Sequence, residues 1–293
     1  MYAHLAKSVE EYLLQKGNED VQRRIHLIDH ETWIGYEKAK SIIDKAKDMI
    51  DRPRVTRMHC MLVIGSSDNG KTTIRKRIES LNESRACESG KSQIKVVSFQ
   101  MPPNPDERGF YNSIFRAMLH PIHVSSKKDF VLESLIMHMR DYGVRLLMID
   151  EVQHIERLAN RRQRIILDAI KHLSSELSLP ILAFGPNEAL NIFASDIQLQ
   201  NRFKKVVLPK WEPDDNYLRL LASFEQLIPL KEPSGLNQKN MASKIYHRTN
   251  GTIGEINTLI RDAAKLALKS GLEKITPAII DQVEFESAGD VFI

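Results

Sequence analysis

The chain has 293 residues, of which 27% are charged, 42% hydrophobic and 6% aromatic. This composition is typical of a folded protein with one large or two modest domains, and it excludes an intrinsically disordered chain. No run of 18 apolar residues and no secretory signal pattern is present, so we expect no membrane contact and a cytoplasmic location. Cys60 and Cys87 lack metal-binding spacing, which argues against structural zinc and disulfides.

The net charge of +4 is too small to indicate nucleic-acid binding by itself, but the basic residues are unevenly distributed. Residues 52–77 hold seven Lys and Arg against Asp68 alone, and residues 202–210 hold four with no acid. Residues 273–293 carry a local charge of −4. Each run fits an ordinary solvated helix face, whereas basic runs beside a phosphate site also suit an anionic partner.

The predicted elements begin with helices at residues 21–28 and 36–50, which form a helical arm over residues 1–52 that Pro53 ends. Five short apolar runs then alternate with helical patterns, which predicts an α/β fold with a parallel five-stranded sheet flanked by helices. The strands are expected at 60–64, 94–99, 145–149, 181–184 and 205–208, and the helices between them at 72–81, 109–119, 130–142, 161–177 and 188–193.

The strand signal stops at Trp211, and the remaining chain is predicted to be helical. We therefore expect three parts: the arm at 1–52, an α/β core at 53–211, and a helical lid with an acidic C-terminal tail at 212–293. The lid helices are expected at 215–226, 238–247, 255–270 and 277–286.

A phosphate-binding loop is predicted where the first strand ends, because residues 65–72 match G-x-x-x-x-G-K-[ST] between a strand and a helix. The glycines let backbone N–H groups turn toward phosphates, the Lys supplies a cation, and the Thr hydroxyl can bind Mg²⁺. We expect ATP to contact Gly65, Ser66, Ser67, Asp68, Asn69, Gly70, Lys71, Thr72 and Thr73.

Two carboxylates follow the apolar strand at 145–149. Asp150 is expected to bind Mg²⁺ together with Thr72, and Glu151 to orient a water for attack on the γ-phosphate. The alternative is that the pair only caps the next helix. A water-activating carboxylate favours ATP hydrolysis over phosphorylation of a small molecule, and no guanine-selecting NKxD motif is present.

Two later polar residues complete the predicted catalytic set. Asn187 follows the fourth strand and is expected to sense the γ-phosphate, and Arg202 precedes the fifth strand and is expected to act in the site of a neighbouring subunit. A plain surface Arg is the alternative for Arg202.

The order of these motifs resembles an AAA+ ATPase, and more narrowly the transposition ATPases of the TniB and TnsC type, relatives of MuB. The resemblance spans roughly residues 20–270 and rests on segments 33–36, 69–72, 147–154, 196–203, 208–211, 228–230 and 250–256. It implies ATP with Mg²⁺, a ring or filament on double-stranded target DNA, and partners that are a target-selection protein and the transposase. The lid departs from the AAA+ pattern, because Gly254 and Glu255 stand where many relatives carry an Arg, and slow hydrolysis is the expected consequence.

Two contact predictions are less specific. Trp33, Ile34 and Tyr36 offer flat apolar surfaces for adenine, or they dock the arm on the core. Lys127 and Lys128, ahead of the helix at 130–142, are expected to contact DNA phosphates unless they are simply solvated. The next DNA candidates are Arg161, Arg162 and Arg164.

A replication-initiator or clamp-loader-like ATPase remains the alternative function. An initiator would usually add a helix-turn-helix after the lid, and the acidic residues after Lys274 leave little room for one. A small-molecule kinase would be favoured only if Glu151 were dispensable.

Overall fold

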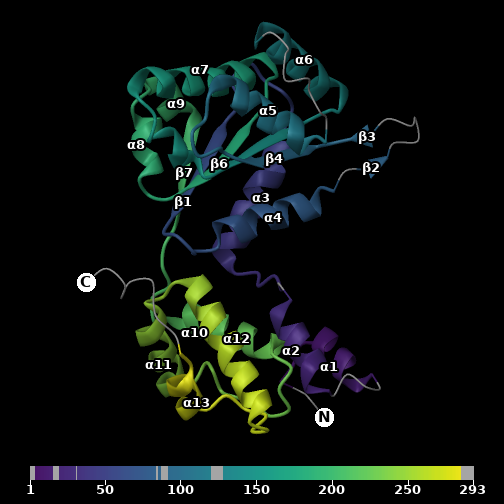
Figure 1. The fold of residues 1–293 in the computed structure, drawn as a ribbon, viewed down its shortest axis with the longest axis vertical. Helices are drawn as coiled ribbons and strands as arrows, with labels where there is room; N and C mark the ends of the chain where they lie inside the picture. The colour runs from purple at the N-terminus through teal and green to yellow at the C-terminus, as the bar shows by residue number, and fades with distance from the viewer. Residues whose placement is uncertain are drawn as a thin grey trace. The chain divides into compact units, whose positions relative to one another are not determined.

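The structure is a computed structural model that describes residues 4–15, 20–30, 32–83, 85–86, 92–119 and 128–284. It divides into two compact units. The α/β unit comprises Glu37–Ser67 and Lys71–Leu208, and the helical unit comprises Met1–Tyr36, Asp68–Gly70 and Pro209–Ile293. Figure 1 shows the elements of each unit.

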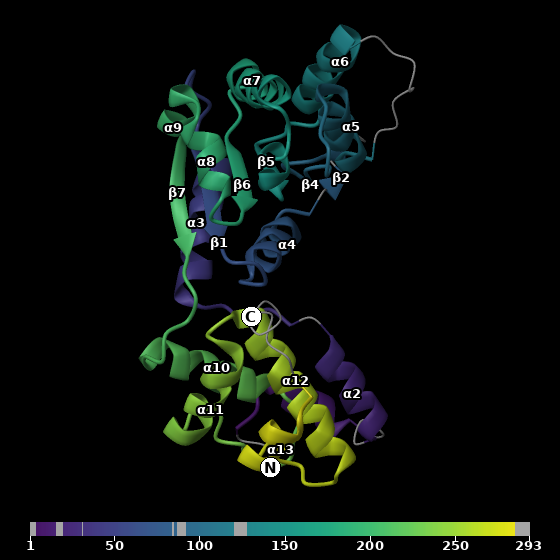
Figure 2. The same ribbon diagram turned by 60° about the vertical axis from the view of Figure 1, so that its left-hand side comes forward.

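The predicted parallel five-stranded sheet is confirmed, with the strand order β4-β5-β6-β1-β7 that Figure 2 displays edge to edge. β1 is the first of these strands in the chain but lies between β6 and β7, so later strands lie on both sides of it. Ligands bind outside the carboxyl ends of parallel strands at such a switch point. The strands are β1 (Cys60–Gly65), β4 (Val96–Gln100), β5 (Leu146–Asp150), β6 (Ile181–Gly185) and β7 (Phe203–Leu208).

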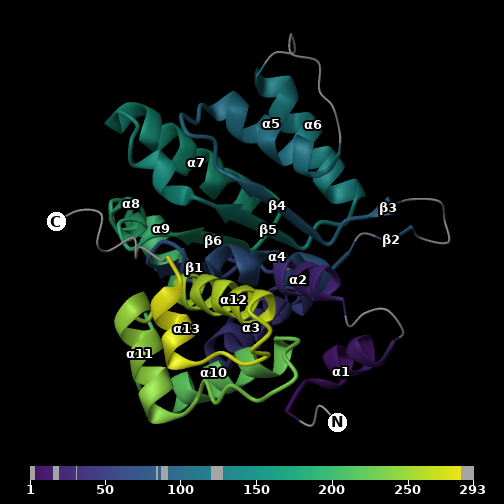
Figure 3. The same ribbon diagram turned by 60° about the horizontal axis from the view of Figure 1, so that its bottom comes forward.

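Helices cover both faces of this sheet, as Figure 3 shows. β1, β5 and β6 are buried along their whole length, as expected for strands packed on two sides. Leu62 and Ile64 of β1 belong to a buried hydrophobic cluster to which the helices on one face of the sheet also contribute side chains. That face carries α5 (Glu107–Ala117), α6 (Lys128–Asp141) and α7 (Asn160–Glu176), and the other carries α3 (Glu37–Asp51) and α4 (Lys71–Leu81).

Several short elements were not predicted. β2 (Arg85–Ala86) and β3 (Ser92–Gln93) form an antiparallel pair outside the main sheet. A 3₁₀ helix (Val152–Ile155) follows β5, and α9 (Ile197–Arg202) follows the predicted α8 (Ala189–Ala194). Asp196 caps α9 by accepting hydrogen bonds from the N–H groups of Gln198 and Leu199.

The helical unit buries its own core. Three of its four C-terminal helices match the predicted ones closely, whereas the last ends at Gln282 and not at residue 286 as predicted. α2 (Val21–Asp29) packs beside α12 and adds Ile28 to their buried cluster. Leu5, Val9 and Leu13, on and beside α1 (Lys7–Leu14), pack against Leu227. The four helices are α10 (Asp215–Leu227), α11 (Lys239–Thr249), α12 (Ile253–Lys269) and α13 (Pro277–Gln282).

The predicted arm at 1–52 is therefore not a compact unit by itself. Residues 1–36 belong to the helical unit, whereas α3 belongs to the α/β unit. α3 buries Ala39, Ile42, Ala46 and Ile50, the apolar face expected from the sequence, and it packs with α4. An amphipathic helix takes its place from the surface that covers this face, and local periodicity does not reveal which surface that is.

The structure bears on two expectations drawn from composition, which concern membrane-spanning helices and the cysteines. Within the described ranges, no helix is both long and apolar enough to cross a membrane. Cys60 is a buried free thiol, and burial raises its pKa. Cys87 lies outside the described residues.

Candidate nucleotide-binding site

The predicted phosphate loop lies between the end of β1 and the start of α4. Gly65 ends the strand and Lys71 begins the helix, with Thr72 and Thr73 in its first turn. Asp68 and Gly70 have φ angles of 54° and 82°, so the backbone is left-handed at both residues. Loops with such left-handed positions can direct several N–H groups to one side, which suits a bound anion. Ser66 and Ser67 form the first part of the same loop.

Lys71 is held inside the loop. Its Nζ atom donates to the carbonyl oxygens of Gly65 at 2.7 Å and Ser66 at 2.6 Å, and the residue is only 8% exposed. A cation in this position is prearranged for a phosphate that approaches the loop. The N-terminus of α4 adds its positive dipole end beside it.

The tip of the loop, Asp68–Gly70, belongs to the helical unit. Asn69 is 2% exposed and donates from Nδ2 to the Pro209 carbonyl at 2.9 Å. The N–H of Gly254, at the start of α12, donates to the Asp68 carbonyl at 3.0 Å. A Cβ at residue 254 would lie about 2 Å from the Asp68 carboxylate, so any side chain there would require the Asp68 side chain to move. The lid residue that departs from the AAA+ pattern thus has a packing role at the loop tip.

The two predicted magnesium ligands are adjacent. Thr72 Oγ1 donates to Asp150 Oδ2 at 3.2 Å, and Asp150 is 3% exposed at the end of β5. One hydroxyl and one carboxylate are hard oxygen donors of the kind that Mg²⁺ takes together with substrate phosphates. Among the described residues, no group of three or more His, Cys, Asp and Glu could hold a metal alone. The donor pair of the Thr72 hydroxyl and the Asp150 carboxylate fits Mg²⁺ bound jointly with a nucleotide.

Arg75 also contacts this oxygen, which the sequence analysis missed. Its Nε donates to Asp150 Oδ2 at 3.1 Å, and its Nη1 donates to Ser98 Oγ at 2.9 Å and Glu79 Oε1 at 2.5 Å. Arg75 follows Thr72 by three residues, so both lie on one face of α4. The three-residue spacing could have indicated that Arg75 faces the site, but it does not identify Asp150 on β5 as its partner.

Glu151 has a left-handed backbone conformation with φ 56° and ψ 39°. Such a conformation costs a residue other than glycine on the order of 1–3 kcal/mol and persists where surrounding contacts fix it. The Glu151 N–H donates to Asp150 Oδ1 at 3.0 Å, and Glu151 Oε2 accepts from Gln153 Nε2 at 2.5 Å. The half-buried Glu151 side chain thus lies directly beyond the predicted metal ligand. It does not cap the 3₁₀ helix that follows.

Asn187 lies at the same edge of the sheet. Ile64 of β1 pairs with Gly185 of β6, so the residues after both strands are neighbours. Asn187 comes two residues after the end of β6 and is exposed. The fold therefore brings the phosphate loop, Asp150, Glu151 and the Asn187 segment to one edge of the sheet.

Arg202 lies at the opposite edge. It ends α9 just before Phe203, which pairs with Cys60 at the start of β1. The phosphate loop follows the far end of β1, roughly 17 Å away at 3.3 Å per residue. Arg202 donates from Nη1 to Ser175 Oγ at 2.9 Å. It cannot reach the phosphate loop of its own subunit.

The predicted adenine contacts belong to the helical unit. Tyr36 packs edge-to-face on Trp211 with ring centroids 5.1 Å apart, and burial raises the pKa of Tyr36 to about 12. Tyr36 Oη would lie 3.6 Å from a Cβ placed on Gly70, so this ring adjoins the loop tip. Trp33 and Ile34 are half-buried. Their role as adenine contacts stays a prediction.

The predicted DNA contacts are not tested. Lys127 lies outside the described residues, and Lys128 begins α6 without a described side chain. Arg161, Arg162 and Arg164 are exposed on α7.

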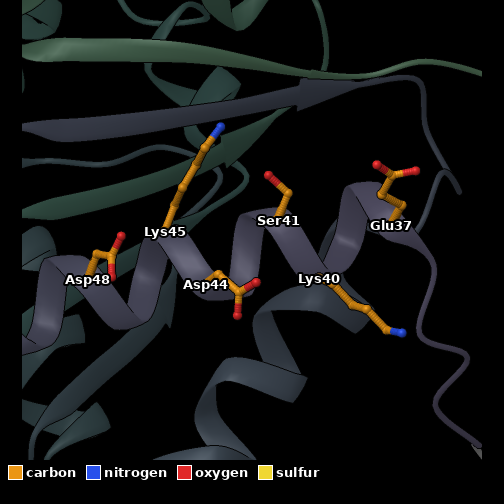
Figure 4. Close-up of a pocket in the computed structure, with 6 residues that line it drawn as sticks. All are labelled: Glu37, Lys40, Ser41, Asp44, Lys45 and Asp48. Atoms are coloured by element: carbon orange, nitrogen blue, oxygen red, sulfur yellow. The ribbon is translucent and has the colours of Figure 1, made fainter.

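A separate hollow of about 450 Å³ lies along α3. Acids and lysines alternate in it, and Figure 4 shows Lys40 and Lys45 pointing to opposite sides of the helix. Groups that diverge from one helix do not converge on a ligand, so this hollow does not compete with the phosphate loop as the site. It is lined by Glu37, Lys40, Ser41, Asp44, Lys45 and Asp48.

Known structures share this fold. The ORC2 protein of Aeropyrum pernix is 17% identical, with a TM-score of 0.62 over 87% of this chain and 70% of that one. Cdc6p from Pyrobaculum aerophilum is 15% identical, with a TM-score of 0.63 over 86% and 68%. Drosophila ORC bound to DNA is 14% identical, with a TM-score of 0.56 over 92% and 66%.

No curated protein matches the chain in sequence. The family model described as bacterial TniB protein matches residues 24–213, which is more than half of the chain. The matched region contains the phosphate loop, both carboxylates and Arg202. The chain therefore belongs to the bacterial TniB family, and it is a P-loop ATPase with an AAA+ fold.

Proposed function

We propose that this chain is an ATP-dependent DNA-binding regulator of transposition. It forms a ring or filament on double-stranded target DNA, and it links a target-selection protein to the recruitment and activation of the transposase. The observation that carries the proposal is membership of the TniB family together with a complete set of nucleotide-site residues. The Orc neighbour that is bound to DNA adds support for a nucleic-acid partner.

The proposed hydrolysis follows from the positions of the site residues. Backbone N–H groups of residues 65–72 and the Lys71 ammonium hold the phosphates of ATP. The ORC2 neighbour is a structure of ADPNP and ADP complexes, which supports a nucleotide as the ligand. Thr72 and Asp150 hold Mg²⁺, which when bound neutralises charge on the β- and γ-phosphates. Glu151 accepts a proton from the attacking water, and Asn187 orients that water.

Arg202 acts between subunits in this proposal. Its position at the far edge of the sheet supports action in a neighbour's site, because it cannot act in its own. Hydrolysis then depends on assembly, and ATP binding and DNA binding become coupled.

Assembly on DNA is the test of the proposal. The wild-type chain with a non-hydrolysable ATP analogue and a duplex of arbitrary sequence should form regular rings or filaments in electron micrographs. Lys71→Ala should form none. Isolated monomers of the wild-type chain on DNA at saturating analogue would contradict the proposal.

A replication-initiator-like function is the second candidate, and the Orc and Cdc6p likeness favours it. The two functions differ in what the assembled protein recruits. A purified transposase encoded beside this chain should be stimulated by the DNA-bound assembly under our proposal, whereas an initiator should leave its activity unchanged.

A further inference from the structure

The hydrogen bond between Gln153 and Glu151 is a feature of the site that the proposed mechanism does not use. Gln153 lies on the 3₁₀ helix after β5, two residues beyond Glu151. Its Nε2 donates to Glu151 Oε2 at 2.5 Å. A hydrogen bond from an amide donor to an ionised carboxylate belongs to the charge-assisted class.

The surroundings of Gln153 define the orientation of its amide. Only the NH₂ end can face the carboxylate, since the oxygen end would meet Glu151 with two lone-pair acceptors. The other end, Oε1, is buried and has no hydrogen-bond partner among the described residues. Leaving that oxygen unpaired is unfavourable, so the amide is kept there by the bond at its other end and by packing.

Gly185, the last residue of β6, provides the space for this amide. A Cβ on Gly185 would lie 3.3 Å from Gln153 Oε1, 3.0 Å from Val152 Cγ2 and 2.9 Å from Ala189 Cβ. Any side chain at residue 185 would therefore press on the segment that carries Gln153. The glycine has an ordinary φ angle, so close packing and not backbone conformation is what requires it.

We infer that Gln153 is a positioning residue for ATP hydrolysis, which fixes one oxygen of the Glu151 carboxylate and leaves the other to accept a proton from water. The inference rests on the proposed role of Glu151. A free Glu side chain samples several rotamers, and only some of them present an oxygen toward the phosphate loop. The bond to Gln153 and the left-handed backbone at Glu151 restrict this sampling before ATP arrives.

The test replaces Gln153 with Met, which has a similar shape but no donor. Single-turnover hydrolysis of ATP should slow about tenfold, the size expected when a catalytic side chain regains its rotamer freedom. The dissociation constant for ATP should change by less than about twofold, because the Gln153 amide is bonded to Glu151 and is not among the residues proposed to hold the phosphates. Gln163→Met, at a half-buried position on α7, is the matched control and should hydrolyse ATP at the wild-type rate.

A double-mutant cycle separates positioning from a structural role. In the Glu151→Gln background, Gln153→Met should cause no further loss of hydrolysis, since it acts only through the Glu151 carboxylate. Gln153→Asn, whose amide is too short to reach Glu151, should show the same loss of hydrolysis as Gln153→Met. It replaces the Met variant in the test if that variant folds poorly. Both variants should unfold within a few degrees of Gln163→Met.

Three results would overturn the inference. Unchanged or faster hydrolysis in Gln153→Met would show that the bond is idle or holds Glu151 back. An equal loss in the Glu151→Gln background would show a structural effect. Wild-type hydrolysis by Glu151→Gln alone would show that the proposed base is wrong, and the cycle distinguishes this failure from the other two.

Discussion

Asp150 accepts hydrogen bonds from Thr72 and Arg75 on the same oxygen, and only Thr72 belongs to the phosphate motif. Arg75 is 17% exposed and the Asp150 side chain 4%, so water screens their attraction only in part. Arg75 thus forms an ion pair with the carboxylate. It also places a positive charge beside the predicted Mg²⁺ position.

Arg75→Gln removes that charge and keeps a hydrogen-bond donor. Because like charges repel, we expect half-maximal hydrolysis at a Mg²⁺ concentration roughly threefold lower than for the wild type. A Mg²⁺ titration of hydrolysis at saturating ATP measures the shift. Lys76→Gln, at the exposed next position of α4, is the control for charge removal. An unchanged Mg²⁺ requirement in Arg75→Gln would show that this arginine has only a structural role.

Glu151→Gln keeps the shape of the side chain but removes the carboxylate that can take a proton. We expect ATP affinity close to that of the wild type and turnover lower by a factor of about 10² to 10⁴, the range for loss of a general base. Nucleotide titration and phosphate release measure the two effects. Turnover near the wild-type rate would assign water activation to another group.

The site residues that could be predicted from the sequence are those that lie close together in one segment of the chain. Lys71 and Thr72 belong to a contiguous loop, and Asp150 and Glu151 end one apolar run, so one local pattern identified each pair. Arg75 was missed because its partner Asp150 lies on another segment of the chain, and Gln153 was missed because it lies on a 3₁₀ helix that was not predicted.

At the scale of elements, a partly buried ion pair joins α2 to the segment between α12 and α13. Arg24 on α2 is 1% exposed. Its Nη1 donates to Glu273 Oε1 at 2.7 Å, and its Nε donates to the Pro229 carbonyl at 2.8 Å. Burial opposes ionisation of Glu273, but the hydrogen bond and charge of Arg24 outweigh it and hold the pKa of this carboxyl below its usual value. The ion pair thus ties the N-terminal helices into the helical unit.

The lowered pKa of Glu273 predicts a pH dependence of stability. The unfolded carboxyl takes up its proton at higher pH than the folded one, so the stabilisation is present above pH 4.5 and is lost as the pH falls through the folded pKa. Glu273→Gln should be less stable than the wild type at pH 7 and should lose less stability between pH 5 and about pH 3. Thermal unfolding across this range is the measurement. Asp281→Asn, at an exposed pair, should behave as the wild type, and an unaltered pH slope in Glu273→Gln would contradict the account.

The strands of the sheet could be predicted because buried parallel strands read as continuous apolar runs. The β2–β3 pair was missed because each strand has only two residues, too few for a pattern. α9 was missed because it has only six residues and the first of them, Ile197, is 74% exposed. The arm was assigned as one part because the pairing of α2 with α12 joins segments over 200 residues apart, which local periodicity cannot show.

At the scale of the whole molecule, the proposed action of Arg202 between subunits means that each site takes catalytic groups from two copies of the chain. Arg202→Ala should reduce hydrolysis by a factor of about 10³ or more while ATP binding by the single subunit is unchanged. Mixing Arg202→Ala with Lys71→Ala should restore part of the activity, because some interfaces then join an intact loop to an intact arginine. No recovery at any mixing ratio would show that Arg202 does not act between subunits.

We propose that this TniB-family chain couples ATP hydrolysis to DNA binding, and phosphate release with and without duplex DNA is the direct test. The wild-type chain should release phosphate slowly and only with Mg²⁺, a duplex of arbitrary sequence should accelerate the release several-fold, and Lys71→Ala should release none in either condition. Hydrolysis that ignores DNA, or that persists in Lys71→Ala, would contradict it.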